Sequence, residues 1–174
     1  FWMIGFLLEI DLIKDISRIL LVPFAVLTLI YTAFLFAQAK GRDYWQNPAL
    51  PFHMFIHGTI LGAAFLLFFL ALHIPSPEIT EALNTILVYA IGFHLFLIII
   101  DLLVKPKAHE ARLVSKMIHK GKFAKQFWII AVFMGNIIPL ILLLSGLSSI
   151  NLIVATLLII GTWASNRILI KAPQ

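Results

Sequence analysis

Charged residues are rare along this chain and divide it into long apolar stretches. Positions 19–39 carry no charge, and these 21 residues would span about 31 Å as a helix, the thickness of a hydrocarbon core. The next uncharged stretch runs over 44–77, and the prolines near both of its ends restrict the expected helix to 52–74. A third stretch, 82–104, holds a single charge near its end, Asp101. Each of the three predicts one transmembrane helix.

The longest uncharged stretch lies in the C-terminal half and predicts two further spans. Positions 126–166 carry no charge over 41 residues, which would reach roughly 61 Å as one helix, about two bilayer thicknesses. The serine- and glycine-containing segment 145–149 predicts a turn. We therefore expect transmembrane helices at 126–145 and 150–169.

The N-terminal residues predict a preceding helix and a loop. Positions 1–8 are apolar and are expected to form the end of a preceding transmembrane helix, while the mixed charges of 9–18 predict an outer loop. Because the chain opens on Phe1 in the middle of hydrophobic sequence, we expect a fragment of a longer polypeptide. The whole pattern predicts an all-α, polytopic transmembrane helix bundle.

The composition supports a membrane protein. Hydrophobic residues make up 61% of the 174 positions and charged residues 12%, against about 25% charged in soluble domains. This balance excludes a disordered chain and disfavours a water-soluble globule, which would have to bury nearly all of its apolar residues. There is no cysteine, so thiolate-ligated iron–sulfur clusters and cysteine nucleophiles are excluded within this sequence.

The distribution of Lys and Arg predicts the orientation in the membrane. Eleven of the 13 basic residues follow the first, third and fifth spans, which end at one face: Lys40, Arg42, Lys105, Lys107, Arg112, Lys116, Lys120, Lys122, Lys125, Arg167 and Lys171. Only Lys14 and Arg18 lie on the opposite side. Because basic loops are retained in the cytoplasm, we expect 105–125 and the C-terminus to be cytoplasmic and 75–81 to face outside.

The basic loop itself contains a predicted helix. Over 107–120, apolar residues recur every three or four positions between Lys, Arg and His. This spacing predicts an amphipathic helix that ends at Gly121. We favour a helix that lies on the anionic lipid surface over one that docks a partner protein.

Polar side chains inside the spans are the first candidates for function, because burying an ionisable group in hydrocarbon costs several kcal/mol. Asp101 lies near the cytoplasmic end of its span, His57 and His94 lie deeper, and Tyr31 and Asn136 add polar groups from two other spans. Histidine changes its charge near neutral pH. Together these residues predict a proton relay from the cytoplasm toward mid-membrane.

Structural interpretations of the same residues stay open. Asp101 lies four positions before Lys105 and could form an ion pair on one helix face. His57 and His94 could be neutral histidines that hydrogen-bond to their neighbours, and Tyr31 could serve packing. Two histidines on adjacent antiparallel helices could also be the axial ligands of a haem b. Their depths in the membrane, calculated from the rise per residue of a helix, differ by roughly 6 Å. No other metal site is expected.

A second candidate site precedes the first span. Glu9, Asp11 and Arg18 would lie at the outer membrane surface. There a carboxylate could accept the proton that a quinol releases on oxidation, and an arginine could hold a head-group oxygen. The alternative is an ordinary solvated loop of mixed charge.

Two stretches resemble a known family. The segment from Tyr31 to Arg42 with its Lys-Gly-Arg turn, followed by Trp45, Asn47-Pro48 and Leu50-Pro51, resembles the signature of the NrfD-like family of polysulfide-reductase membrane subunits. A second pattern, Gly121, Phe127-Trp128, Gly135 and Pro139, is similar to one that opens a later helix of that family. The resemblance implies eight or more helices in two four-helix bundles, with the five spans here as the fourth to eighth helices.

The same resemblance implies a function. Members of the family hold no haem and pass electrons between a membrane quinone and an iron–sulfur partner subunit, as part of a complex rather than as a stand-alone enzyme. It implies a quinone pocket near the outer face, which favours Asp11, Glu9 and Arg18 as the residues that bind quinone or menaquinone. Further subunits and lipids are the expected partners, nucleic acid is not, and the expected location is the cytoplasmic membrane of a prokaryote.

Two other classes of protein remain as alternatives. One is a haem-b membrane anchor of a respiratory complex, which the two histidines suggest. The other is a secondary transporter, for which an inverted internal repeat and broken helices at mid-membrane would be expected. The sequence shows no convincing repeat.

Overall fold

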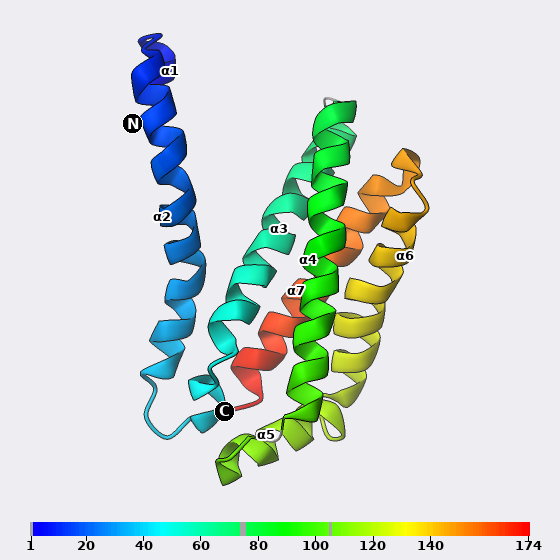
Figure 1. Cartoon of the computed structure of the whole chain (residues 1–174). Helices are drawn as coiled ribbons and strands as arrows, with labels where there is room; N and C mark the ends of the chain where they lie inside the picture. Colours follow the sequence, from blue (N-terminus) through cyan, green and yellow to red (C-terminus); the bar gives the residue numbers. More distant parts are fainter. Residues whose placement is uncertain (1, 74–75, 105) are drawn as a thin grey trace.

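The computed structural model describes residues 2–73, 76–104 and 106–174, and within these ranges every regular element is a helix (Figure 1). The α-helices are α1 (Trp2–Leu7), α2 (Asp11–Ala37), α3 (Leu50–Leu72), α4 (Pro77–Leu103), α5 (His109–His119), α6 (Ile138–Leu144) and α7 (Asn151–Lys171). Short 3₁₀ helices, η1 (Asp43–Gln46) and η3 (Ser148–Ile150), and a π-helix, η2 (Gln126–Ile137), complete the chain. The all-α prediction is confirmed.

Five of the described helical segments are long and apolar enough to cross a membrane: α2, α3, α4, the continuous η2–α6 segment and α7. They correspond to the five expected spans, with small shifts at the ends. Among the four later spans, the largest difference from the prediction is at the start of α4, which begins at Pro77 instead of position 82. Proline has no N–H to leave unsatisfied at the first helical position, and Glu78 complements the positive end of the helix dipole.

The predicted loop at 9–18 requires a correction. Helix α2 begins at Asp11, so residues 11–18 continue the first span as helix, and only the short connection to α1 lies outside a helix. Lys14 donates to Asp11 at 2.9 Å and Arg18 to Asp15 at 3.1 Å, both at a spacing of three residues. Such pairs stabilise an exposed helical turn, and they explain why a stretch rich in charge is helical here.

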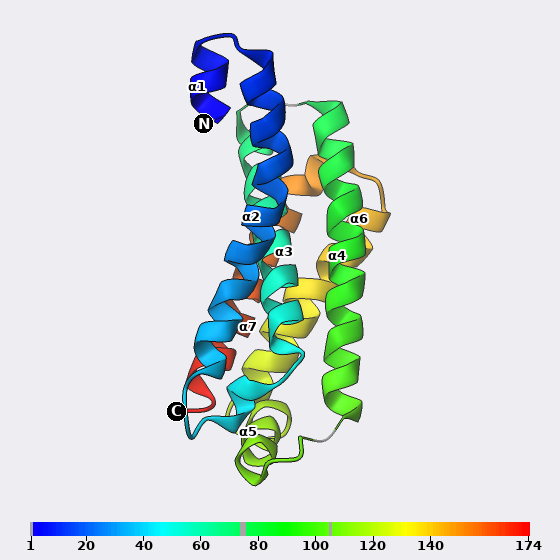
Figure 2. The ribbon, with the colours of Figure 1, turned by 60° about the vertical axis from the view of Figure 1, so that its left-hand side comes forward.

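Helices α3, α4, η2–α6 and α7 form a bundle, and α2 packs against α3 at its edge (Figures 1 and 2). The bundle core consists of large side chains that are almost completely buried, among them Ile60, Leu67, Leu87, Ile91 and Leu158. Figure 1 shows α2 leaving the bundle toward its N-terminal end, and its one buried residue, Ala33, lies close to its C-terminal end.

Two glycines bring η2 and α7 into backbone contact. A Cβ added to Gly135 would collide with the Cα of Gly161, and one added to Gly161 would collide with Gly135. Small residues at a helix crossing allow this close approach inside a membrane. The wide turns of η2 end at Ile137, and α6 begins at Ile138 with Pro139 in its first turn, where the missing N–H of proline interrupts the hydrogen-bond ladder. Asn136, next to the crossing, is thereby held in the core.

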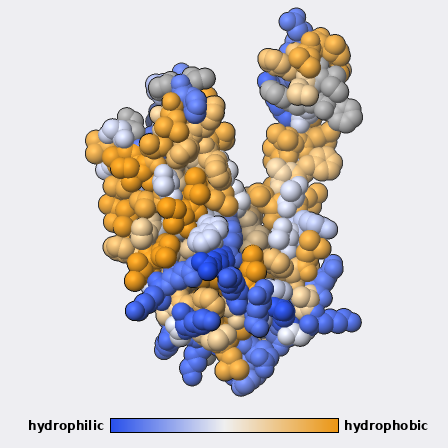
Figure 3. Space-filling view, turned by 180° about the vertical axis from the view of Figure 1, so that it is seen from behind, coloured by the Kyte–Doolittle hydropathy of each residue, from blue (hydrophilic) through white to orange (hydrophobic). Residues whose placement is uncertain are grey.

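The basic end of the bundle is closed by a cap made of η1, α5 and the C-terminal residues. Trp45 donates its indole N–H to the carbonyl oxygen of Leu169 at 2.9 Å, which ties η1 to α7. The predicted amphipathic helix is present as α5, but its most buried residues pack on the bundle rather than facing lipid: Ala111, Val114 and Ile118 are buried. Figure 3 shows hydrophilic residues gathered at this end, below the apolar spans.

Candidate functional site

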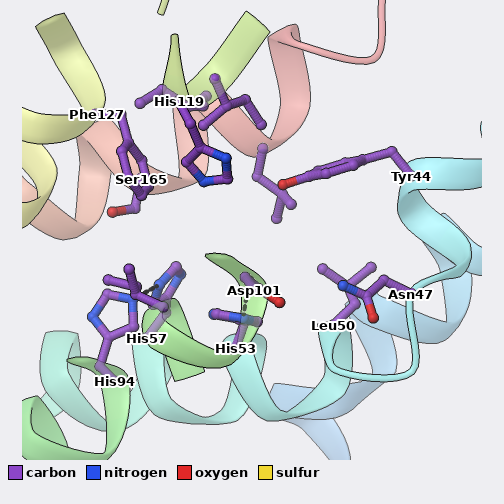
Figure 4. Close-up of a pocket in the computed structure, with 14 residues that line it drawn as sticks. Tyr44, Asn47, Leu50, His53, His57, His94, Asp101, His119, Phe127 and Ser165 are labelled. Carbon is purple, nitrogen blue, oxygen red and sulfur yellow. Dashed lines mark hydrogen bonds and ion pairs between the residues drawn. The ribbon is translucent and has the colours of Figure 1, made fainter. Parts of the chain in front are cut away.

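The polar side chains of the spans converge beneath the cap. His57 from α3 and His94 from α4 are 5% and 3% exposed, and their Nε2 atoms lie 3.0 Å apart. His53, one turn before His57, lies beside them, and one ring nitrogen of each of the three histidines falls within 4.8 Å of the others. Asp101 lies next to His53 (Figure 4). We call these four residues the histidine cluster.

Helix spacing brings the cluster together. His53 and His57 are four residues apart and share one face of α3, while His94 and Asp101 are seven apart and share one face of α4. The two helices are adjacent and antiparallel, so the first turns of α3 meet the last turns of α4. Each helix therefore contributes one residue near the cap and one residue deeper in the bundle.

Two asparagines hold the buried histidine pair from the remaining two helices. Asn136 on η2 places its Oδ1 2.8 Å from Nδ1 of His94, and Asn166 on α7 places its Oδ1 2.7 Å from Nδ1 of His57. A continuous row of polar contacts thus runs from α7 through α3 and α4 to η2. Every helix of the bundle contributes one member.

The hydrogen-bond partners of Asn136 define the protonation of His94. The Asn136 amide nitrogen donates to the carbonyl oxygen of Ala131 at 2.6 Å, so its Oδ1 is the group that faces His94. Nδ1 of His94 is therefore the donor. A neutral His94 then has its lone pair on Nε2, and this lone pair points at His57.

The contact with Asn166 gives the histidine pair two states, because either end of the Asn166 amide can face His57. With Oδ1 of Asn166 facing Nδ1 of His57, both Nε2 atoms carry lone pairs at 3.0 Å, and one proton shared between them makes this contact a hydrogen bond. If the Asn166 amide turns over, His57 becomes the other tautomer and donates to His94 without an added proton. The two hydrogen-bonded states differ by one proton.

A cavity of about 70 Å³ connects the histidine cluster to the cap. His53, His57, His94 and Asp101 line one side, and Tyr44, His119 and Ser165 lie across from them (Figure 4). Since a water molecule needs roughly 10–15 Å³ of such space, the cavity has room for more than one. Nε2 of His53 lies 2.9 Å from Oδ2 of Asp101 at the edge of this space.

Burial shifts the pKa values of two residues on the cap side of the cavity, Tyr44 and His119. It raises the pKa of Tyr44, with the negative charge of Asp101 acting in the same direction, so the phenol keeps its proton at neutral pH. Burial also lowers the pKa of His119, although the charge of Asp101 and a hydrogen bond to the backbone of Ser115 act in the opposite direction. A neutral imidazole and a phenol can each donate and accept a hydrogen bond, so the lining is suited to ordering water.

The structure brings together four of the five residues predicted for the proton relay. Asp101, His57, His94 and Asn136 belong to the cluster and its supports, whereas Tyr31 lies 60% exposed on α2 and joins no contact with them. Lys105, the alternative partner of Asp101, lies outside the described residues. The observed partner of Asp101 is His53.

Two functional side chains were missed by the sequence reasoning. The four-residue spacing of His53 and His57 is a signal that could have identified His53, which the prediction did not include. Asn166 carries no comparable signal, because an asparagine near a helix end is common. Only the packing of α7 against α3 reveals its contact with His57.

The outer candidate residues do not converge. Asp11 pairs with Lys14 and Arg18 pairs with Asp15, and the Asp11 side chain is 86% exposed. Glu9 lies in the turn between α1 and α2 with a left-handed backbone, φ 55°. Among the described residues no hydrogen bond or ion pair joins Glu9, Asp11 and Arg18, so their assignment to quinone stays a prediction.

Fold and site together define a polytopic helical membrane protein with a buried, hydrogen-bonded histidine cluster near one membrane face. The model of the family described as polysulphide reductase, NrfD, matches residues 2–174, and the chain belongs to this family. The family resemblance of the two sequence patterns is thereby confirmed. The family is one of membrane subunits of quinone-linked oxidoreductase complexes, which typically act with other subunits. Neither a curated protein nor a solved structure shows significant similarity to the chain.

Proposed function

We propose that this chain exchanges electrons between a membrane quinol, such as menaquinol, and an iron–sulfur partner subunit, and that its bundle takes up protons from the basic face. The observation that carries the second part is the 3.0 Å contact between Nε2 of His57 and Nε2 of His94, buried below a polar cavity. A buried pair whose two states differ by one proton is a place where a proton can be held.

The proposed route begins at the cap. Water in the cavity would meet Asp101 and His53 first, and the ring centre of His53 lies 6.1 Å from that of His57 and 6.0 Å from that of His94. This gap is one that a single water or a ring movement bridges. The acidic side chain beside His53 favours a positive charge that arrives there.

The route ends in the core. Beyond Asn136 the helices pack through nearly fully buried Ile60, Leu87, Ile91 and Leu158, with no polar group among these four. Beyond His94 on α4, Tyr89 and Thr85 are exposed, and the next polar side chain of this helix that is not exposed is Asn84, ten residues from His94 and roughly 15 Å further along the helix. The described residues therefore support a half-path that loads a proton from one face, not an open channel.

Haem is not part of this proposal. A bis-histidine iron would need its two nitrogens about 4 Å apart, since each metal–nitrogen bond is roughly 2.0 Å long. His57 and His94 are closer than this and touch directly. The sequence contains no cysteine, so a thiolate-ligated iron–sulfur cluster would have to be held outside these 174 residues.

The quinone site is proposed at the N-terminal end of α2, on the strength of the family. Asp11 would accept or donate the quinol proton, and Glu9 and Arg18 would complete the site. In this arrangement quinone chemistry and proton uptake occupy opposite ends of the molecule. Electron transfer at one end could then be coupled to charge movement through the other.

The experiment is proton uptake during quinol oxidation by the assembled complex in liposomes. Asp101→Asn removes the acidic group at the entrance, so we expect fewer protons to be taken up per electron. The rate of electron transfer, measured in the presence of an uncoupler, should be maintained. His109→Gln is the matched control, because His109 is an exposed histidine of the cap that does not line the cavity. An Asp101→Asn complex with an unchanged proton-to-electron ratio would contradict the proposed path.

A further inference from the structure

The histidine cluster also has the composition of a transition-metal site. Three imidazoles offer ring nitrogens within 4.8 Å of one another, from adjacent helices, at the edge of a cavity. We propose that His53, His57 and His94 bind one Zn²⁺ or a similar divalent transition-metal cation. Binding itself follows from the geometry; its effect on proton uptake rests on the function proposed above.

The distances require only small adjustments. In a tetrahedral zinc site with bonds of about 2.0–2.1 Å, ligand nitrogens lie about 3.4 Å apart. Nε2 of His57 and Nε2 of His94 lie 3.0 Å apart, so the pair would open by a few tenths of an ångström. His53 would move its ring further, by roughly an ångström, and its side chain is next to a cavity that permits this.

The surroundings already orient the lone pairs. A histidine that ligates a metal usually donates its other ring N–H to a carbonyl or carboxylate oxygen. Oδ1 of Asn136 accepts from Nδ1 of His94, and with Oδ1 of Asn166 facing Nδ1 of His57 both Nε2 lone pairs are directed into the same space. Asp101 lies beside His53, with Oδ2 2.9 Å from Nε2, which places a carboxylate next to the third imidazole. A zinc ion would thus satisfy the facing lone pairs that a shared proton satisfies in its absence.

The donor set selects the class of ion. Two histidines four residues apart on one helix are a common zinc-binding spacing, and His53 and His57 have it. Imidazole suits Zn²⁺, Cu²⁺ and Ni²⁺, whereas Ca²⁺ and Mg²⁺ require mostly oxygen ligands. The cavity supplies a path from the basic face and room for a water as fourth ligand.

A bound ion has a direct consequence for the proposed path. It would occupy the position of the proton shared by His57 and His94 and separate that pair from Asp101 and the cap. Proton uptake from the basic face would then stop, while quinone chemistry at the far end of α2 would remain intact. A metal ion bound at this site would therefore inhibit proton uptake.

The test is metal binding to the assembled complex after chelator treatment, without turnover. Co²⁺ is the probe, because a nitrogen-rich tetrahedral Co²⁺ site gives a visible absorption band. For the wild type we expect this band to appear with one Co²⁺ bound per chain and to disappear when Zn²⁺ displaces the Co²⁺. The band should be absent in His53→Gln and present in His109→Gln. No such band in the wild type, or the same band in His53→Gln, would overturn the site.

This outcome is distinguishable from failure of the proposed function. If Asp101→Asn lowers the proton-to-electron ratio but no Co²⁺ band forms, the metal site fails and the path stands. If the band forms and is lost in His53→Gln while Asp101→Asn leaves the ratio unchanged, the metal site stands and the path fails. Binding is measured without turnover, so neither result depends on the other.

Discussion

Gly135 and Gly161 meet backbone to backbone where η2 crosses α7, and neither position has space for a methyl group. The crossing places Asn136, the residue after Gly135, against His94, and Gly161 lies on the same helix as Asn166, which contacts His57. The two asparagines that hold the histidine pair are thus positioned by one close helix contact. Packing at this crossing and the chemistry of the cluster are linked.

The first prediction concerns this crossing. Gly161→Ala should lower the thermal stability of the solubilised complex, because overpacking a close contact typically costs about 1–3 kcal/mol. The control is Gly62→Ala on α3, where an added Cβ meets nothing within 4 Å and alanine is the better helix former. Equal melting temperatures for the two variants would show that the helices separate freely at the crossing.

The second prediction concerns Asn136. Asn136→Ala leaves Nδ1 of His94 without its acceptor and the carbonyl of Ala131 without its donor. Leaving a buried polar group unsatisfied costs about 1–3 kcal/mol, so we expect a less stable complex and slower proton uptake. Asn84→Ala is the comparison, because Oδ1 of Asn84 is buried without a hydrogen-bond partner. If Asn136→Ala and Asn84→Ala have the same stability and the same rate of proton uptake, Asn136 has no role in the site.

The third prediction concerns the proposed quinone site. Asp11→Asn should lower quinol-linked turnover by roughly 10²-fold, the usual contribution of a positioned general base, while the complex still assembles. The control is Glu78→Gln, which neutralises an exposed carboxylate outside the proposed quinone site, on the first turn of α4. Turnover that is unchanged in Asp11→Asn would return Glu9, Asp11 and Arg18 to the status of an exposed, charged helix end.

The fourth prediction is the topology. Because the chain contains no cysteine, a single introduced cysteine gives this subunit one labelling site. Glu110→Cys on α5 should react only from the cytoplasmic side, and Glu78→Cys only from the outer side, as the distribution of basic residues requires. Labelling of position 110 by an impermeant reagent from outside intact cells would reverse the orientation.

Much of the fold could be predicted because hydrocarbon imposes a simple rule. Stretches of span length with no charge, or with Asp101 alone, predicted the five candidate membrane helices of the described residues, since a charge in the bilayer is costly. The rule failed at residues 11–18, where the charges pair with one another along a helix and so do not end it. Helix ends depend on such local pairs and on capping, which a count of charges does not include.

The site was predicted only in part, for a different reason. His57, His94, Asp101 and Asn136 stand out in the sequence because they are polar groups inside apolar spans. Which of these residues touch depends on how each helix is rotated about its axis, and the hydrophobic pattern of a lipid-exposed helix barely encodes this rotation. Tyr31 therefore looked equivalent to the others, although it faces away from the cluster.

The central claim is that the histidine pair carries protons, and His94→Phe tests it most directly. Phenylalanine fills a similar volume but neither accepts nor donates a proton, so it breaks the link between His57 and Asn136. His73→Phe makes the same substitution at an exposed position outside the cluster. Protons taken up per electron should be measured for both variants in liposomes carrying the assembled complex. We predict a lowered ratio for His94→Phe and the wild-type ratio for His73→Phe; the wild-type ratio in both would contradict the account.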